Sequence, residues 1–174
     1  MVLGQFFFQS KNTPQIAKSL LGKFLVRRYR GKTAVHLITG VEAYDGFQDK
    51  ASHAHRGKTE RNKIMFGPAG HWYIYFTYGM HWMLNIVTGP KDYPAAILIR
   101  GIENIKGPAR LTKALHIDKK LHRKSASKIS GLWMEDRGVK ISRNRIKSAP
   151  RIGVAYAGPI WSKKKYRFFI KNPH

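Results

Sequence analysis

The chain contains no cysteine, which excludes a disulfide framework and any metal site built on thiolates. It also has no apolar run approaching the length of a membrane span, and no basic-then-apolar signal segment at its start. Acidic residues are few, since nine Asp and Glu stand against 33 Lys and Arg, and the formal net charge is +24. This excess predicts a polyanionic partner, nucleic acid before an anionic membrane surface. We therefore expect a cytoplasmic, nucleoid-associated protein.

Apolar and aromatic residues make up 43% of the chain, enough to bury a core in a single domain spanning 1–174. Two helices are predicted, one over 13–22 with Thr13 as its N-cap and one over 108–115. Strand patterns cover 23–28, 33–44, 71–78, 82–87, 95–99, 139–142, 151–156 and 166–170. Many short strands with few helices favour an α+β fold with a mostly antiparallel sheet.

The segment 71–87 is predicted to be a β-hairpin. Its first strand alternates at the strand period, with Tyr73 and Tyr75 on one face, and Gly79 supplies the turn. A core filled with aromatic side chains is one interpretation, but Tyr78 at the hairpin tip is hard to place in a core. Cations flank the hairpin, and a nucleic acid suits such a surface because its bases stack and its phosphates attract positive charge: His53, Arg56, Lys58, Arg61 and Lys63.

Two charged residues at the ends of predicted strands are candidates for chemistry. Glu42 is one of the few carboxylates, and Tyr44 and His53 follow it closely. Arg100 directly follows the short apolar strand 95–99, a place where catalytic groups often lie. A solvated charge or an ion pair is the alternative interpretation for each.

Two polar segments connect these elements. The loop 49–62 contains His53 and His55, but their spacing matches no strong ligand pattern, so we expect no metal site. The run 119–128 is rich in basic residues and is predicted to be a mobile loop that can contact phosphate.

Residues from these segments form an ordered set: Glu42-Ala43-Tyr44, Ala51-Ser52-His53, Arg61-Asn62, Met65-Phe66, Gly70, Tyr73-x-Tyr75-x-x-Tyr78-Gly79-Met80, Asn85, Arg100, Gly107-Pro108, Lys113-Ala114-Leu115, Arg151-Ile152-Gly153-Val154 and Ala157-Gly158. The set closely resembles the alkyladenine (3-methyladenine) DNA glycosylase family over essentially the whole chain. This resemblance implies a single mixed α+β domain around a curved, mostly antiparallel β-sheet with a few packed helices. It also implies excision of damaged purines from double-stranded DNA.

The resemblance assigns catalytic roles residue by residue. Glu42 falls at the general base, which activates a water for attack on the sugar carbon of a damaged nucleotide. Arg100 falls at the residue that holds this water and the carboxylate, and the backbone carbonyl of Ile152 is a further water contact. No lysine is in the matched set, and a strand-cutting glycosylase would use a lysine Schiff base. The expected enzyme is therefore monofunctional and leaves an abasic site.

The resemblance also implies a base pocket. Tyr44 and Tyr75 match the aromatic residues that sandwich the extruded base, and His53 lies at the edge of that base. Tyr78 matches the wedge that enters the duplex in place of the nucleotide. Asn85 matches the residue that crowds the exocyclic amino position of guanine.

A non-catalytic DNA- or RNA-binding module is the alternative function. It explains the charge and the aromatic residues equally well, but it gives no reason for Glu42 to lie among them. A membrane-surface protein would need a longer basic amphipathic helix. The segment 53–62 looks one residue shorter than in the family. We expect a monomer that needs neither a cofactor nor a metal and does not associate with membranes.

Overall fold

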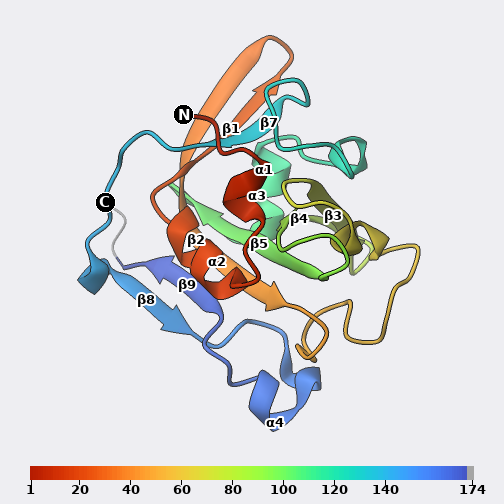
Figure 1. Cartoon of the computed structure of the whole chain (residues 1–174). Helices are drawn as coiled ribbons and strands as arrows, with labels where there is room; N and C mark the ends of the chain where they lie inside the picture. The colour runs from red at the N-terminus through yellow and green to blue at the C-terminus, as the bar shows by residue number, and fades with distance from the viewer. Residues whose placement is uncertain (172–174) are drawn as a thin grey trace.

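One long strand, β2 (Lys32–Asp45), organises the sheet in the computed structural model, which describes residues 1–171 (Figure 1). Along its first half β2 pairs with β1 (Phe24–Tyr29), and along its second half it pairs with β5 (Ala95–Ile102). The short strand β9 (Arg167–Ile170) pairs with the middle of β2. A single strand therefore connects every part of the sheet.

Five further strands bring the sheet to nine strands within residues 1–171: β3 (Trp72–Thr77), β4 (His81–Val87), β6 (Ile105–Lys106), β7 (Leu132–Glu135) and β8 (Ile146–Ala149). The main order is β3-β4-β5-β2-β1-β7, and every pairing is antiparallel. β3 and β4 form the predicted hairpin. The predicted α+β fold around a curved antiparallel sheet is confirmed.

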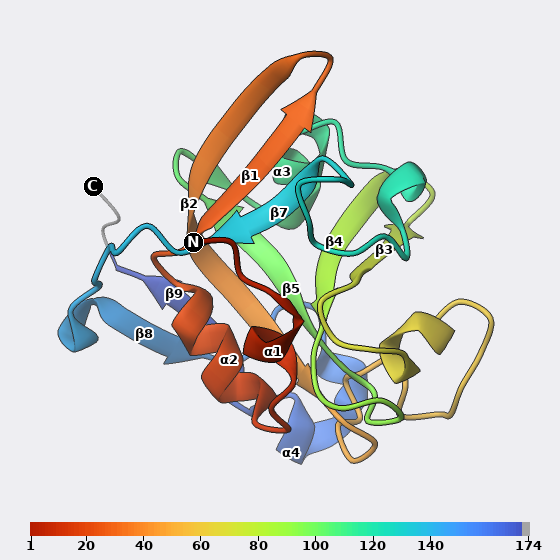
Figure 2. The same ribbon diagram turned by 45° about the horizontal axis from the view of Figure 1, so that its top comes forward.

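The helices are short: α1 (Gln5–Phe8), α2 (Thr13–Leu20), α3 (Pro108–Ala114) and α4 (Gly158–Trp161), with 3-10 turns at Lys63–Phe66, Lys119–Leu121, Arg143–Arg145 and Ala155–Ala157. Figures 1 and 2 show α1 and α2 together in front of the sheet. The prediction of Thr13 as N-cap is wrong, because the Asn12 side chain accepts the Gln15 N–H at 3.1 Å and Thr13 is buried. Within residues 1–171, no helix has the length and apolar character needed to cross a membrane.

The two faces of the sheet have different contents, because successive side chains of a strand point to opposite sides. Val41 of β2 and Ile97 and Ile99 of β5 lie in the main hydrophobic core, together with Leu20 of α2 and Leu111 of α3. The residues that alternate with these three at the paired positions, Glu42 of β2 and Leu98 of β5, lie outside this cluster. This leaves one face of the sheet for a site.

Three expectations about the second half of the chain are corrected. Residues 139–142 form no strand, and their apolar character goes into packing, because Ile141 lies against the main core from a loop. The strand β7, which pairs with β1, was not predicted from the sequence pattern. Residues 151–156 form a loop with a 3-10 turn, in which Gly153 has a φ of +74° that a strand cannot hold. β8 was also not predicted, although its partner β9 matches the expected last strand.

The basic segment 119–128 is not the mobile loop that was predicted. Leu121 and Ala126 are buried, and the backbone of the segment runs alongside β3. Trp72 donates its N–H to the Lys124 carbonyl at 2.9 Å, and its own carbonyl accepts the Arg123 N–H at 2.8 Å. These bonds fix the segment against the hairpin, because a buried backbone group left without a partner would be costly.

Candidate active site

A cavity of about 320 Å³ opens on the face of the sheet that points away from the main core. Four of its lining residues form a row across four neighbouring strands, because Tyr73 pairs with Asn85, Asn85 with Leu98 and Leu98 with Glu42. Residues that pair directly in antiparallel strands point to the same side. The register of the sheet therefore brings Glu42 and Tyr73 into one hollow, although they are far apart in the chain.

Glu42 lines this cavity, is fully buried and is held by three groups. The Ile152 N–H donates to its Oε1 at 2.9 Å, and the Tyr44 hydroxyl donates to its Oε2 at 3.0 Å. The Arg100 guanidinium lies 3.4 Å from Oε1. All three partners complement a negative charge, which offsets the cost of removing a carboxylate from water. The structure presents the amide of Ile152 to Glu42, whereas the sequence-based role concerned its carbonyl.

Arg100 reaches Glu42 because of an irregularity in the sheet. The sequence pattern predicted that the strand ends at residue 99, directly before Arg100. In the structure β5 continues to Ile102, so Arg100 lies inside the strand. The pairing passes from Val41–Ile99 to Gly40–Gly101, which leaves Arg100 as the extra residue of a β-bulge. A bulge re-aims the side chain of its extra residue, and here that side chain lines the cavity beside Glu42.

Neutral aromatic side chains form the wall of the cavity. Burial, followed by the nearby Glu42 charge, raises the pKa of Tyr44 well above its usual value, and burial raises the pKa of Tyr73 to about 12. Desolvation and then the Arg61 charge lower the pKa of His53 to about 4, although part of its ring is open to solvent. His53 Nδ1 is 2.9 Å from the Tyr73 hydroxyl, and its ring centroid is 4.7 Å from that of Tyr75. Among the described residues that line the cavity, Glu42 and Arg100 are the only Asp, Glu, Lys or Arg side chains.

Asn85 and Tyr78 lie at different depths of the cavity. Asn85 is buried on β4, where its Nδ2 donates to the Tyr73 carbonyl at 3.2 Å, so it links the two strands of the hairpin as well as lining the cavity. Tyr78 lies at the hairpin tip, 83% exposed, with a φ of +52° that non-glycine residues rarely adopt. The side chain of Tyr78 is thus directed out of the core, as predicted.

A family model described as methylpurine-DNA glycosylase (MPG) matches residues 6–174. The chain belongs to the methylpurine-DNA glycosylase family. Relatives in this family cover nearly all of it. One from Carboxydothermus hydrogenoformans is 39% identical over 95% of this chain and 93% of its own length.

Two further relatives are similar to this chain to the same extent. One from Legionella pneumophila strain Lens is 40% identical over 96% of this chain and 94% of its own length. One from Anaeromyxobacter dehalogenans is 38% identical over 99% of this chain and 84% of its own length. All three carry the name "Putative 3-methyladenine DNA glycosylase".

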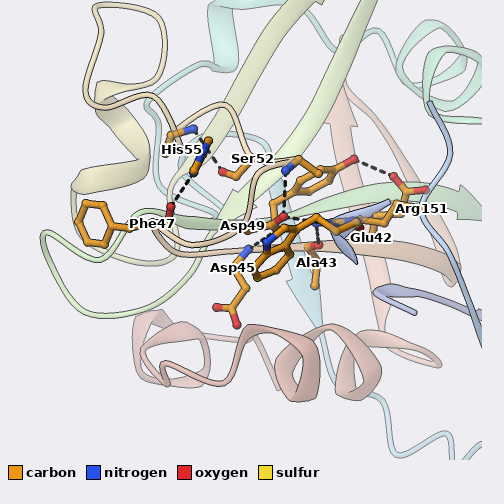
Figure 3. A network of polar contacts seen from close by, with 12 residues as sticks. Glu42, Ala43, Asp45, Phe47, Asp49, Ser52, His55 and Arg151 are labelled. Carbon is orange, nitrogen blue, oxygen red and sulfur yellow. Dashed lines mark hydrogen bonds and ion pairs between the residues drawn. The ribbon is translucent and has the colours of Figure 1, made fainter. Parts of the chain in front are cut away.

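A buried ion pair between Asp49 and Arg151 was not predicted as part of the site. The Arg151 guanidinium donates to both oxygens of Asp49, at 2.5 Å and 2.8 Å, and also to the Ala43 carbonyl at 2.8 Å (Figure 3). Both side chains are fully buried. Burial alone would lower the pKa of Arg151, but the bonds to Asp49 outweigh it and raise that pKa. The pair joins β2, the turn at 49–52 and the loop that carries Ile152.

The sequence contained a signal for this pair. Carboxylates are scarce in the chain, and the argument that singled out Glu42 applies equally to Asp49. The predicted site residues otherwise come together, since all eight line the one cavity: Glu42, Tyr44, His53, Tyr75, Tyr78, Asn85, Arg100 and Ile152. Among residues 1–171 the structure shows no group of three or more His, Asp or Glu side chains that could hold a metal ion.

We expect Asp49→Asn to lower the free energy of unfolding by about 3–5 kcal/mol, because it leaves the buried Arg151 guanidinium without a counter-charge. Urea denaturation of the DNA-free protein measures this. Asp136→Asn is the matched control, since its pair with Lys23 is partly exposed and surface ion pairs of this kind contribute little to stability. Equal losses in the two variants would contradict an anchoring role for Asp49.

The low pKa of His53 predicts a pH dependence of stability. The unfolded value is near 6.5, so between about pH 6.5 and pH 4 the unfolded chain binds a proton at His53 that the folded chain does not. This contribution to stability is therefore lost as the pH falls through that window. NMR titration of the His53 ring should give a midpoint near 4 in the folded protein, and His53→Gln should remove that part of the pH dependence. A midpoint near 6.5 in the folded state would refute the expectation.

Proposed function

We propose that this protein is a monofunctional DNA-3-methyladenine glycosylase. It extrudes alkylated or deaminated purines from double-stranded DNA, hydrolyses the N-glycosidic bond and leaves an abasic site. The observation that carries the proposal is a fully buried carboxylate, Glu42, at the base of a neutral aromatic cavity in a chain of net charge +24. Family membership and the names of the relatives support the same reaction.

The surroundings of Glu42 suit a general base. A water placed against Glu42 attacks the anomeric carbon, the glycosidic nitrogen leaves with the bonding electrons, and Glu42 takes the proton of the water. The sugar passes through an oxocarbenium-like state, and the same carboxylate supplies a counter-charge to it. Arg100 and the Ile152 amide fix the orientation of the carboxylate, so little rearrangement is needed when the substrate arrives.

The aromatic wall suits an extruded purine. Taking a base out of the duplex costs about a few kcal/mol, and each aromatic–base stack returns about 1–3 kcal/mol. Tyr44 and Tyr75 line the cavity from β2 and β3, and His53 lies at its edge. A purine alkylated at a ring nitrogen is cationic, so neutral tyrosine faces add cation–π attraction. A neutral His53 avoids repelling the same cation.

Two further features complete the proposal. None of the described residues that line the cavity is a lysine, which supports a monofunctional reaction without a Schiff base. The exposed Tyr78 at the hairpin tip is placed to enter the duplex where the nucleotide leaves it. A single chain holds the whole candidate site, which supports activity as a monomer.

A non-catalytic nucleic-acid-binding module is the alternative, and a duplex oligonucleotide carrying one hypoxanthine or ethenoadenine separates the two. Cleavage at the lesion only after alkali treatment supports the glycosylase. Release of 3-methyladenine from methylated DNA tests the substrate that the relatives' names give. An absence of excision on every alkylated or deaminated purine, with DNA binding intact, would support the module.

We expect Glu42→Gln to bind lesion-containing DNA but to lose excision by at least about 100-fold, the contribution of a typical general base. The amide preserves the shape, and the Tyr44 hydroxyl can turn to accept a hydrogen bond from it. Single-turnover excision measures the loss. Glu60→Gln, which removes an exposed carboxylate, is the control and should retain activity. Excision within tenfold of wild type would exclude Glu42 as the base.

We expect Asn85→Ser to raise excision of guanine-type bases relative to hypoxanthine. The Asn85 side chain lines the cavity and is proposed to crowd the exocyclic amino group of guanine, and a smaller side chain relaxes such exclusion without removing activity. The ratio of the two single-turnover rates in one duplex context is the quantity to measure. Because Asn85 also bonds the Tyr73 carbonyl, thermal unfolding of the variant should be recorded beside the rates. An unchanged ratio in a folded, active variant would leave Asn85 with a structural role only.

A further inference from the structure

Tyr156 lies on the rim of the cavity and has no role in the site described so far. It belongs to the 3-10 turn Ala155–Ala157, and its hydroxyl donates to the Ala51 carbonyl at 2.7 Å. Its side chain is nevertheless 67% exposed. The hydroxyl therefore anchors the residue while most of the ring stays open to whatever occupies the cavity.

Tyr156 also separates two cavities of opposite character. The base cavity is walled by neutral aromatic residues, whereas a second cavity of about 640 Å³ beside it is lined by cations, including Lys50, Arg56 and Arg61. Tyr156, His53 and Ser52 line both. A nucleotide is itself divided in this way, into a flat base and an anionic backbone. Tyr156 thus lies where a nucleotide seated in the base cavity passes toward the basic cavity.

The loop that carries Tyr156 is also held by contacts that do not involve Tyr156. Arg151 fixes the loop to Asp49, and the Ile152 amide fixes it to Glu42. A tyrosine that served packing alone would bury its ring, since that is where its stabilising free energy comes from. The exposed ring on an independently anchored loop calls for a partner outside the protein.

We infer that Tyr156 contacts the substrate, with its ring packed against the extruded purine nucleotide at the mouth of the base cavity. The inference rests on the proposed function and adds a residue to it. Two exposed tyrosines from different segments then contact the same nucleotide site. Tyr78 enters the duplex from the hairpin, and Tyr156 receives the nucleotide from the loop 151–157. The Ala51 tether sets how far the Tyr156 ring reaches over the mouth.

Two substitutions separate the ring from its tether. Tyr156→Phe keeps the ring and removes the hydrogen bond to Ala51, whereas Tyr156→Ala removes both. With a duplex that carries one ethenoadenine, stopped-flow fluorescence follows extrusion and single-turnover assays give the excision rate. We expect Tyr156→Ala to weaken the extrusion equilibrium about 5- to 150-fold, the range of one aromatic–base stack. Tyr156→Phe should stay within about threefold of wild type.

Phe6→Ala is the matched control, because Phe6 is 89% exposed on α1 and does not line the base cavity. It should leave extrusion unchanged. Thermal unfolding confirms that each variant folds, and Tyr156→Leu, which keeps an apolar side chain without an aromatic face, replaces Tyr156→Ala if the latter does not.

Two outcomes would overturn the inference. Unchanged extrusion in a folded Tyr156→Ala protein would show that the ring does not contact the nucleotide. Equal losses in the Phe and Ala variants would show that the tether to Ala51 matters and the ring does not. Either result leaves excision by the wild-type protein in place, whereas an absence of excision by the wild type on every lesion would refute the proposed function itself.

Discussion

The site depends on the buried ion pair between Asp49 and Arg151. Asp49 also accepts the backbone N–H groups of Asp45 and Ala51, and Arg151 donates to the carbonyls of Ala43 and Trp161. One pair thus satisfies polar groups from three segments that are distant in the chain. Burying two charges is costly unless their remaining donors and acceptors are occupied, and here most of them are. Because the loop with Ile152 is held in this way, Glu42 receives its hydrogen bond from a fixed position.

The sheet adds a second constraint, which is the separation of its faces. Along β2, Val41 and Ala43 lie in the core while Glu42 and Tyr44 line the cavity, and β5 divides its residues likewise. A slip of one residue in the register would exchange the two sets and bury Glu42 among aliphatic side chains. The β2–β5 pairing shifts register on both sides of Gly40, and the shift that leaves Arg100 as an extra residue turns a cation toward Glu42. Regular pairing and this irregularity both contribute to the candidate site.

Charge is distributed to match a nucleotide. The chain as a whole is strongly positive, which attracts a polyanion from a distance and favours binding that weakens with salt. The walls of the base cavity are neutral at physiological pH, because burial shifts the tyrosine pKa values upward and that of His53 downward. In the proposed reaction, an extruded base would meet flat, uncharged aromatic faces, and the Glu42 carboxylate would lie where positive charge develops on the sugar. This division is what the proposed function requires and what a simple binding module lacks.

The residue pattern alone determined much of this protein. Alternation along 71–78 predicted the hairpin, scarcity singled out Glu42, and the ordered set carried the resemblance to a family to which the chain belongs. Local sequence patterns gave wrong strand predictions where the formation of a strand depends on a neighbouring strand to pair with. Residues 139–142 have the composition of a strand but form a loop in which Ile141 packs against the main core.

Other features were decided only by the tertiary structure. The bulge that turns Arg100, the pairing of Asp49 with Arg151 and the place of Tyr156 between two cavities each join segments far apart in the chain. A sequence records which side chains are available and how they alternate within one strand. It does not record strand register or which loop lies against which, because these are set by the packing of the whole core. The residues of the candidate site could therefore be predicted from the sequence. The contacts that fix their positions form only when the chain is folded.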